Sequence, residues 1–243
     1  METHRRIGMT TTEEEQVTSA KEAAGRRAAD MVETGTVVGL GTGSTVWFTL
    51  VRLAERIQAE GLEIVGVPTS LDTTDKATEL GIPLVGLGEV EKIDFTIDGA
   101  DEIDGDFQMI KGGGGALLRE KVVASISTRE AIVVGQDKVV EKLGTTFLLP
   151  VEVASFALPT VSRELRALGC EPVLRVSDPG VALLTDNGNQ ILDCRFPDGI
   201  DDPRALEGVL AGIPGVVESG LFIDLAHVLV IGKEGGTAEV REK

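Results

Sequence analysis

The sequence predicts an α/β fold: a mostly parallel, Rossmann-like sheet with helices on both faces, plus a smaller ferredoxin-like α+β domain. Three observations predict it. Short apolar runs alternate with segments of helical length through the first 135 residues, as in βαβ units. The 243 residues are 42% hydrophobic and include 30 glycines, which suits a large core with many tight turns. Beyond Leu143 the alternation gives way to strands grouped around two helices.

The first half of the chain supplies the elements of the parallel sheet. A capping-box pattern at residues 12–15 starts a helix predicted over 12–33, and Gly35 ends it. The apolar run 36–41 ends in glycine and predicts a buried strand, which an apolar-rich helix follows over 44–59. The same reasoning predicts, in order, a strand at 64–67, a helix at 72–80, strands at 82–85 and 93–98, a helix at 116–127 and a strand at 131–135.

The second half predicts a small domain inserted into the first. The expected elements are a strand at 149–153, a helix at 158–168, a strand at 172–176, strands at 181–186 and 190–194, a helix at 202–211 and a strand at 216–222. Asn187-Gly188 predicts that the two central strands form a hairpin. A last strand at 227–231 returns to the first sheet. The main domain is therefore expected to span residues 1–144 and 225–243, with residues 145–224 inserted.

The net charge of −17, from 40 acidic and 23 basic residues, argues against two classes of partner. No basic stripe is available for a nucleic-acid backbone, and anionic lipid repels an acidic surface. A phosphate ligand would have to be bound by local donors rather than attracted by the overall field. The charge either serves ordinary solubility or reflects adaptation to a salt-rich cytoplasm, where ions screen self-repulsion; we favour this halophilic interpretation.

The remaining sequence features indicate a cytoplasmic protein. The N-terminal segment is polar, without the apolar stretch of a signal peptide, and no apolar run approaches the ~20 residues that span a bilayer. Cys170 and Cys194 lack metal-ligand spacing, and we expect buried reduced thiols rather than a disulfide. Neither His4 nor His227 is placed as a catalytic base or metal ligand.

Four clusters lie where a predicted strand gives way to a loop or helix, the edge at which open α/β sheets bind ligands. In the first, Gly39 to Thr45, glycines let the backbone approach an anion, and the next helix offers free N–H groups. It is neither a dinucleotide fingerprint nor a P-loop, since Ser44 stands in place of the third glycine and no lysine follows. Phosphate binding and a simple tight turn both remain open.

The other three clusters carry charged groups. The second places four acids between Asp98 and Asp104, for metal binding, for acid–base chemistry or merely as a solvated loop. The third is Lys111 followed by four glycines, whose cost in backbone entropy is explained by close approach to a ligand oxygen. The fourth is Glu120, either a first-turn acid favoured by the helix dipole or a base that reaches the cleft.

In this order and spacing, the clusters resemble the ribose-5-phosphate isomerase A family. The segments that carry the resemblance are GTGST, DGADEI, QMIKGGGGALLREK, LLPVEV, TDNGNQILD and IPGVVESGLF, and it extends over about residues 21–232. The family fold, a main α/β sheet with a smaller α+β module, matches the predicted elements. Gly115 stands where alanine is common in the family, a departure expected to be harmless.

The resemblance implies an aldose–ketose isomerase that interconverts ribose 5-phosphate and ribulose 5-phosphate through a cis-enediolate in the pentose phosphate pathway. It implies no cofactor, no metal, and a homodimer or homotetramer. Glu120 would move the proton between C2 and C1, and Lys111 would hold the developing oxyanion together with Gly112, Gly113 and Gly114. The remaining implied residues are Asp98, Gly99, Ala100 and Asp101 at the sugar hydroxyls and ring opening, Thr42, Gly43, Ser44 and Thr45 at the phosphate and sugar, and Lys21 and Lys138 at the phosphate.

Three other functions share parts of this pattern. Coenzyme A transferases use a glutamate on a similar sheet, but this chain lacks a second subunit-sized half. Amino-sugar phosphate deaminases favour a histidine-assisted site, which the two histidines do not supply. A sugar-phosphate-sensing module of a transcription regulator would need a basic helix-turn-helix, and residues 1–33 do not encode one.

Overall fold

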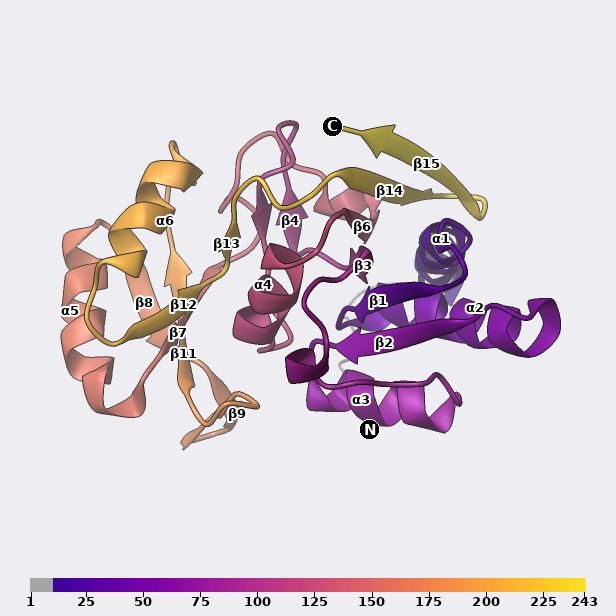
Figure 1. The fold of residues 1–243 in the computed structure, drawn as a ribbon. Helices are drawn as coiled ribbons and strands as arrows, with labels where there is room; N and C mark the ends of the chain where they lie inside the picture. The colour runs from indigo at the N-terminus through magenta and orange to yellow at the C-terminus, as the bar shows by residue number, and fades with distance from the viewer. Residues whose placement is uncertain (1–10) are drawn as a thin grey trace.

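The computed structural model describes residues 11–243, and a six-stranded sheet forms its centre (Figure 1). The strand order is β15-β14-β6-β3-β1-β2, with parallel pairing except between β14 and β15. The bounds are Thr36–Leu40 for β1, Ile64–Pro68 for β2, Phe95–Asp98 for β3, Glu130–Gly135 for β6, Val228–Lys233 for β14 and Thr237–Glu242 for β15. The predicted parallel sheet is confirmed. His4, which we did not expect to be a catalytic base or metal ligand, lies outside the described residues.

Two features of this sheet differ from the prediction. The segment 82–85 forms no strand and makes a single bridge, from Leu84 to Gly66. Pro83 has no N–H to donate to a ladder, and the chain then turns into a short 3₁₀ helix, Leu87–Glu89. The antiparallel edge strand β15 was not predicted, because its half-exposed, charged sequence lacks an apolar run.

Helices cover both faces of the sheet. On one face, α1 (Thr11–Ala29) and α2 (Ser44–Glu60) pack on a core that includes Leu50 and Val133. α3 (Leu71–Glu79), which runs beside β2, packs on the same core through Ala77 (Figure 1). On the other face, α4 (Leu117–Ser125) packs against Ile132 and Phe222. α1 ends before the predicted residue 33, because the chain tightens into i→i−3 hydrogen bonds after Ala29. No described helix is both long and apolar enough to span a bilayer.

A second, antiparallel sheet has the order β12-β7-β11-β8. With its two helices it forms the predicted ferredoxin-like β-α-β-β-α-β arrangement. A core of its own, separate from those of the first sheet, includes Val151, Leu165 and Leu210. The bounds are Leu149–Val153 for β7, Leu158–Ala167 for α5, Glu171–Leu174 for β8, Gln190–Arg195 for β11, Pro203–Ala211 for α6 and Val216–Ser219 for β12.

The predicted hairpin around Asn187-Gly188 is wrong. β10 (Val181–Ala182) pairs with β9 (Val176–Asp178), whereas β11 pairs with β7 and β8. The turn itself forms, but side chains hold it rather than a strand ladder. Glu152 Oε1 on β7 accepts hydrogen bonds from three side chains of the turn, those of Thr185, Asn187 and Asn189, at 2.8–3.3 Å.

A third, small sheet connects the other two. β4 (Glu102–Ile103), β5 (Met109–Ile110) and β13 (Leu221–Phe222) pair antiparallel in the order β13-β5-β4. The strand predicted at 216–222 is thus split between two sheets at Gly220. A Cβ at Gly220 would lie 2.4 Å from the carbonyl oxygen of Lys111, so only glycine lets the chain pass there. Gly220 also accepts from the Lys111 N–H at 2.9 Å.

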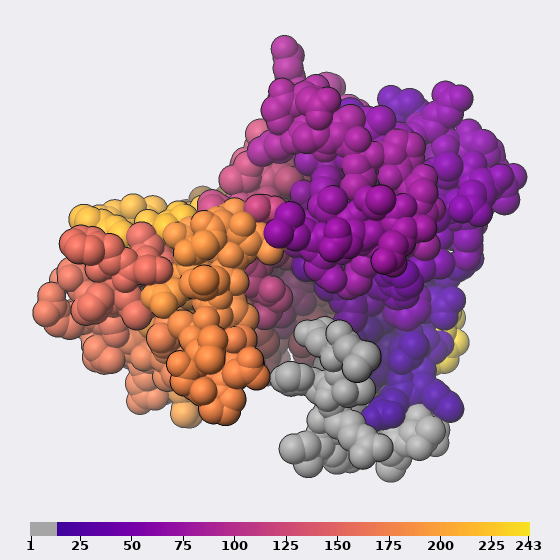
Figure 2. Space-filling model, turned by 90° about the horizontal axis from the view of Figure 1, so that it is seen from below, coloured from indigo at the N-terminus to yellow at the C-terminus, as the bar shows by residue number. Residues whose placement is uncertain are grey.

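The surface is hollowed between the parts built on the two larger sheets. Figure 2 shows orange residues of the second sheet facing indigo and purple residues of the first, with magenta residues from the middle of the chain lying deeper. Residues of both parts line the cavity there, among them Ser44 and Asp72 from the first and Leu183 and Asp186 from the second.

Glu102 fixes the chain where it leaves the first sheet for the second. Its side chain is fully buried, and its two oxygens accept from the N–H groups of Gly144, Thr146 and Phe147 at 2.5–2.7 Å. The Thr146 hydroxyl adds a fourth bond at 2.7 Å. One carboxylate therefore satisfies three backbone donors of the connecting segment.

Replacing Glu102 by alanine should destabilise the fold by about 3–5 kcal/mol, because three backbone N–H groups and one hydroxyl lose their buried acceptor. Thermal unfolding followed by circular dichroism measures the change. Glu102→Gln, which keeps one acceptor oxygen, should fall between the alanine variant and the unchanged protein. A melting temperature for Glu102→Ala equal to that of the unchanged protein would contradict this role.

Candidate active site

The predicted site residues gather around one cavity of about 210 Å³ at the carboxyl ends of β1, β3 and β6. Asp98 alone among them is absent from the lining. The predicted residues in the lining are Lys21, Thr42, Gly43, Ser44, Thr45, Gly99, Ala100, Asp101, Lys111, Gly112, Gly113, Gly114, Glu120 and Lys138. Residues that the sequence analysis did not select complete it: Val46, Val133, Val134, Gly135 and Asp137.

The N-terminus of α2 forms one end of the cavity. No side chain caps this helix, so its first N–H groups remain available to an anion. Lys21 on α1 donates to Ser44 Oγ at 2.8 Å and brings a positive charge to the same end. Lys138, in the 3₁₀ turn Gln136–Lys138 after β6, adds a second positive charge to the cavity lining. Local donors thus provide the positive potential that the net charge of the chain does not.

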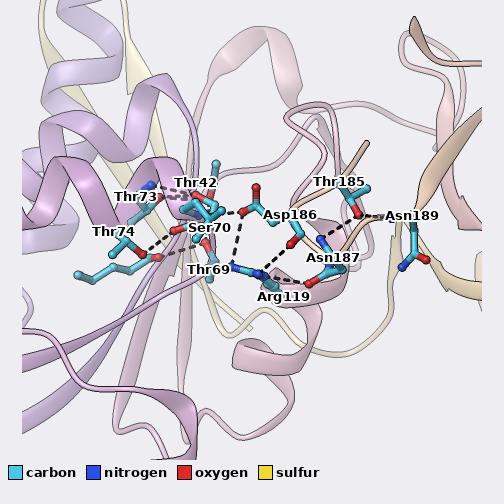
Figure 3. A network of polar contacts seen from close by, with 12 residues as sticks. Thr42, Thr69, Ser70, Thr73, Thr74, Arg119, Thr185, Asp186, Asn187 and Asn189 are labelled. Carbon is cyan, nitrogen blue, oxygen red and sulfur yellow. Dashed lines mark hydrogen bonds and ion pairs between the residues drawn. The ribbon is translucent and has the colours of Figure 1, made fainter. Parts of the chain in front are cut away.

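A hydroxyl cluster supports the loop before α2. Thr42 Oγ1 contacts three hydroxyls at 2.7–3.2 Å, those of Thr69, Ser70 and Thr73 (Figure 3). These residues lie at the end of β2 and the start of α3, where Ser70 caps the helix by accepting from the Thr73 N–H. The loop is therefore held from the side opposite the cavity.

Lys111 is the charged centre of the site. Only 2% of this residue is exposed. Its Nζ lies 3.1 Å from Asp98 Oδ2 and 3.5 Å from Glu120 Oε2, and it donates to the Gly99 carbonyl. The Phe222 ring centroid is 5.3 Å away. Burial alone would lower the pKa of Lys111, but the two carboxylates outweigh it and raise that pKa above its ordinary value, so the side chain stays protonated.

Glu120 lies one turn into α4 and is 5% exposed. Burial raises its pKa to about 8; the charge of Lys111 opposes the shift and that of Asp98 adds to it. No donor among the described residues hydrogen-bonds its Oε2. A carboxyl group with a pKa near neutrality in the lining of a cavity suits reversible proton transfer to a ligand.

The two aspartates of the second cluster have different placements. Asp101 lines the cavity, and its Oδ2 accepts from the Gly113 N–H at 2.7 Å. Burial raises the pKa of Asp101, against the opposing effect of that hydrogen bond. Asp98 lies below the cavity, fully buried, and its Oδ1 accepts from the Thr42 and Gly99 N–H groups at 3.0 and 2.7 Å. Asp98 therefore holds Lys111 and the neighbouring loops from below the cavity lining.

A buried acid outside the predicted set is Glu130 at the start of β6. Its side chain is fully buried, and neither oxygen has a hydrogen-bond partner among the described residues. Burial raises its pKa to about 8, with a smaller opposing contribution from Lys111. The sequence signal that could have identified Glu130 is its position as an acid at the start of an apolar strand. The described residues contain no group of three or more His, Cys, Asp or Glu side chains able to hold a metal ion.

Fold and cavity together define an enzyme site for acid–base chemistry on a small anionic molecule. The sequence model of the family described as ribose 5-phosphate isomerase A (phosphoriboisomerase A) matches residues 65–236. A ribose-5-phosphate isomerase A from Bacillus mycoides (strain KBAB4) is 48% identical over 219 residues, which are 90% of this chain and 98% of the relative. One from Gloeobacter violaceus (strain ATCC 29082 / PCC 7421) is 51% identical over 217 residues, covering 89% and 93%.

Solved structures agree with the sequence relatives. Ribose 5-phosphate isomerase A from Methanocaldococcus jannaschii superposes with a TM-score of 0.87 at 38% identity, covering 92% of this chain and 98% of that one. A D-ribose-5-phosphate isomerase in complex with phospho-erythronic acid gives 0.89 at 35% identity, covering 93% and 99%. The chain belongs to the ribose 5-phosphate isomerase A family.

Glu130 should make stability depend on pH. Because the fold favours its neutral form, ionisation in the unfolded chain costs stability as pH rises from about 4.5 to about 8. Glu130→Gln should therefore melt close to the unchanged protein at pH 5 and at least about 3 °C higher at pH 8. Glu164→Gln, an exposed change on α5, is the control. The same melting difference at both pH values would contradict the shifted pKa.

Proposed function

We propose that this chain interconverts ribose 5-phosphate and ribulose 5-phosphate with Glu120 as the base. The observation that carries the proposal is the pairing of Glu120 with a buried, protonated Lys111 at one cavity, 3.5 Å apart. A sugar phosphate also needs donors for its phosphate group. The uncapped N-terminus of α2, together with Lys21 and Lys138, supports such a site at this cavity. Family membership supports the same substrate, since relatives carry the name of this activity.

The proposed reaction begins with substrate binding and ring opening. The phosphate group binds the N–H groups of α2 and the two lysines, which fixes the distance to the reacting carbons. The bond between C1 and the ring oxygen breaks as Asp101, oriented by the Gly113 N–H, takes the proton of the C1 hydroxyl and passes it to the ring oxygen. The products of this step are the C1 aldehyde and a free C4 hydroxyl.

Proton transfer follows in the open chain. The Glu120 carboxylate removes the proton from C2, and the electron pair moves through C1 to its oxygen to give a cis-enediolate. The Lys111 ammonium and the N–H groups of the glycine loop stabilise the negative oxygen. Glu120 returns the proton to C1, the O2 proton moves to O1, and the carbonyl is now at C2. Asp98 acts beneath the cavity by keeping Lys111 charged.

Glu120→Gln should keep the fold and lower kcat about 10²–10⁴-fold, because the amide cannot accept the C2 proton. Conversion of ribose 5-phosphate, followed spectroscopically, measures it, with exposed Glu164→Gln as the control. In the unchanged protein kcat/KM should rise with pH up to a pKa of about 8, as Glu120 loses its proton. Near-normal turnover in Glu120→Gln would remove Glu120 from the role of base.

Broader assignments complete the proposal. The enzyme would serve the pentose phosphate pathway in the cytoplasm, as a homodimer or homotetramer. We also propose the domain division into residues 1–144 with 225–243 and an insertion of residues 145–224, supported by the separate core of the second sheet. The acidic composition, with a net charge of −17, supports the halophilic assignment.

Salt should stabilise and activate this enzyme if its surface charge is an adaptation. The melting temperature and kcat/KM, both measured with EDTA, should be higher in about 2 M KCl than in dilute buffer, because ions screen repulsion among the acids. Sucrose at matched viscosity is the control for nonspecific effects. Equal melting temperatures in the two buffers would leave ordinary solubility as the role of the charge.

A further inference from the structure

Arg175 reaches the glycine loop of the active site from the second sheet. It lies between β8 and β9, and its Nη1 donates to the carbonyl oxygens of Gly112 and Gly113 at 2.8 and 3.1 Å. No signal in the local sequence predicted this, because the contact joins residues more than sixty positions apart. A side chain from the second sheet thus binds the two peptide groups that follow Lys111.

Asp193 fixes the direction of this guanidinium. Its two carboxylate oxygens accept from Nε and Nη2 of Arg175 at 2.9 and 2.5 Å, a bidentate pair. Both side chains are largely buried, at 13% and 18% exposure. The pair also matches the strand register, since Asp193 on β11 lies opposite Val173 on β8. With Nε and Nη2 bound, Nη1 is left to point at the loop.

Within the loop, one backbone hydrogen bond joins the Gly115 N–H to the Gly112 carbonyl at 3.0 Å, and Arg175 adds a support from outside. Gly112 has a φ of +103°, a conformation that side chains avoid, and the run of glycines has many alternatives of similar energy. In a trans peptide the N–H group points away from the preceding carbonyl. Binding the Gly112 carbonyl therefore directs the Gly113 N–H to the other side, where it donates to Asp101 at 2.7 Å.

The same geometry applies to the next peptide. The Gly113 carbonyl faces Arg175, so the Gly114 N–H points away from Arg175, and Gly114 lines the cavity. The Arg175 charge also acts on Asp101 directly and opposes the rise in pKa that burial causes there. Two of the groups assigned to ring opening and oxyanion binding therefore depend on one guanidinium outside the cavity lining.

We propose that Arg175, anchored by Asp193, is a positioning residue for the isomerisation: it sets the two peptide planes that aim the glycine-loop N–H groups at Asp101 and at the developing oxyanion. This inference rests on the proposed function. It assigns the second sheet a part in catalysis, because the loop that holds the oxyanion is bound from that sheet. The role is limited to the reacting end of the site: among the described residues, no hydrogen bond joins Arg175 to the α2 N-terminus or to Lys21 and Lys138.

The test compares the reacting end with the phosphate end. Arg175→Met should lower kcat about 10–100-fold and should lower the affinity for phospho-erythronic acid by a similar factor. The carboxylate of this compound offers oxygens at the reacting end of the site. Binding of inorganic phosphate should stay within about twofold. Arg175→Lys should recover only part of the loss, because an ammonium cannot form the bidentate pair.

Arg119→Met is the matched control. Arg119 also joins α4 to the second sheet's part, through the Asn187 side chain at 3.0 Å and the Asp186 carbonyl at 3.1 Å (Figure 3). Among the described residues, no hydrogen bond or ion pair joins Arg119 to the glycine loop. It should leave kcat and both ligand affinities within about twofold. If Arg175→Met folds poorly, Asp193→Asn tests the same anchor. If both variants fold, the double variant should lower kcat no more than the more severe single variant does.

The outcomes separate this inference from the proposed function. If the unchanged enzyme isomerises ribose 5-phosphate and Arg175→Met keeps kcat within twofold, the positioning role is wrong and the function stands. Equal weakening of phosphate and phospho-erythronic acid, with a lowered melting temperature, would assign Arg175 a purely structural role. Absence of isomerisation in the unchanged enzyme would instead overturn the proposed function.

Discussion

The site depends on one buried cation shared by two carboxylates. An ammonium group removed from water must be paired, and Asp98 supplies the nearer partner for Lys111 at 3.1 Å. Glu120 lies at 3.5 Å from the same nitrogen. One positive charge cannot fully compensate two buried negative charges, so the acid that faces the cavity retains its proton more readily. The raised pKa of Glu120 is caused mainly by burial; Lys111 opposes the shift, and the charges of Asp98 and Asp101 add to it.

Three separate parts of the fold converge on this balance. Asp98 ends β3, Lys111 follows β5, and Glu120 is in the first turns of α4. The position of Lys111 is fixed from its backbone as well, because Gly220 accepts from its N–H where the chain passes between two sheets. The short third sheet is therefore more than a connection: it holds the lysine at the depth where both acids can reach it.

The sequence predicted much of this because the relevant signals are local. Each cluster of glycines or acids lies at the end of a predicted strand or the start of a helix. Together with the family resemblance, which supplied Lys21 and Lys138, these clusters predicted most of the cavity lining. Contacts formed by the second sheet were not predicted, since Arg175 and Glu152 act on residues far along the chain. The Asn-Gly turn was predicted for the right residues, but its partner is a side chain, which strand patterns do not encode. β4 and β5, each two residues long, are too short for any periodicity.

An acidic chain can still bind an anion at this cavity, because the donors there act at short range. Long-range attraction of an anion would require a positive electrostatic field around the protein, and a chain with a net charge of −17 does not produce one. Contact donors act over a few ångströms, and the α2 terminus, Lys21 and Lys138 lie at the same cavity. Ions reduce the repulsion beyond about 10 Å at 0.1 M salt but leave buried or close pairs largely unscreened. Surface charge can therefore vary with the salt concentration around the protein while the close pairing of Lys111 with Glu120 stays the same.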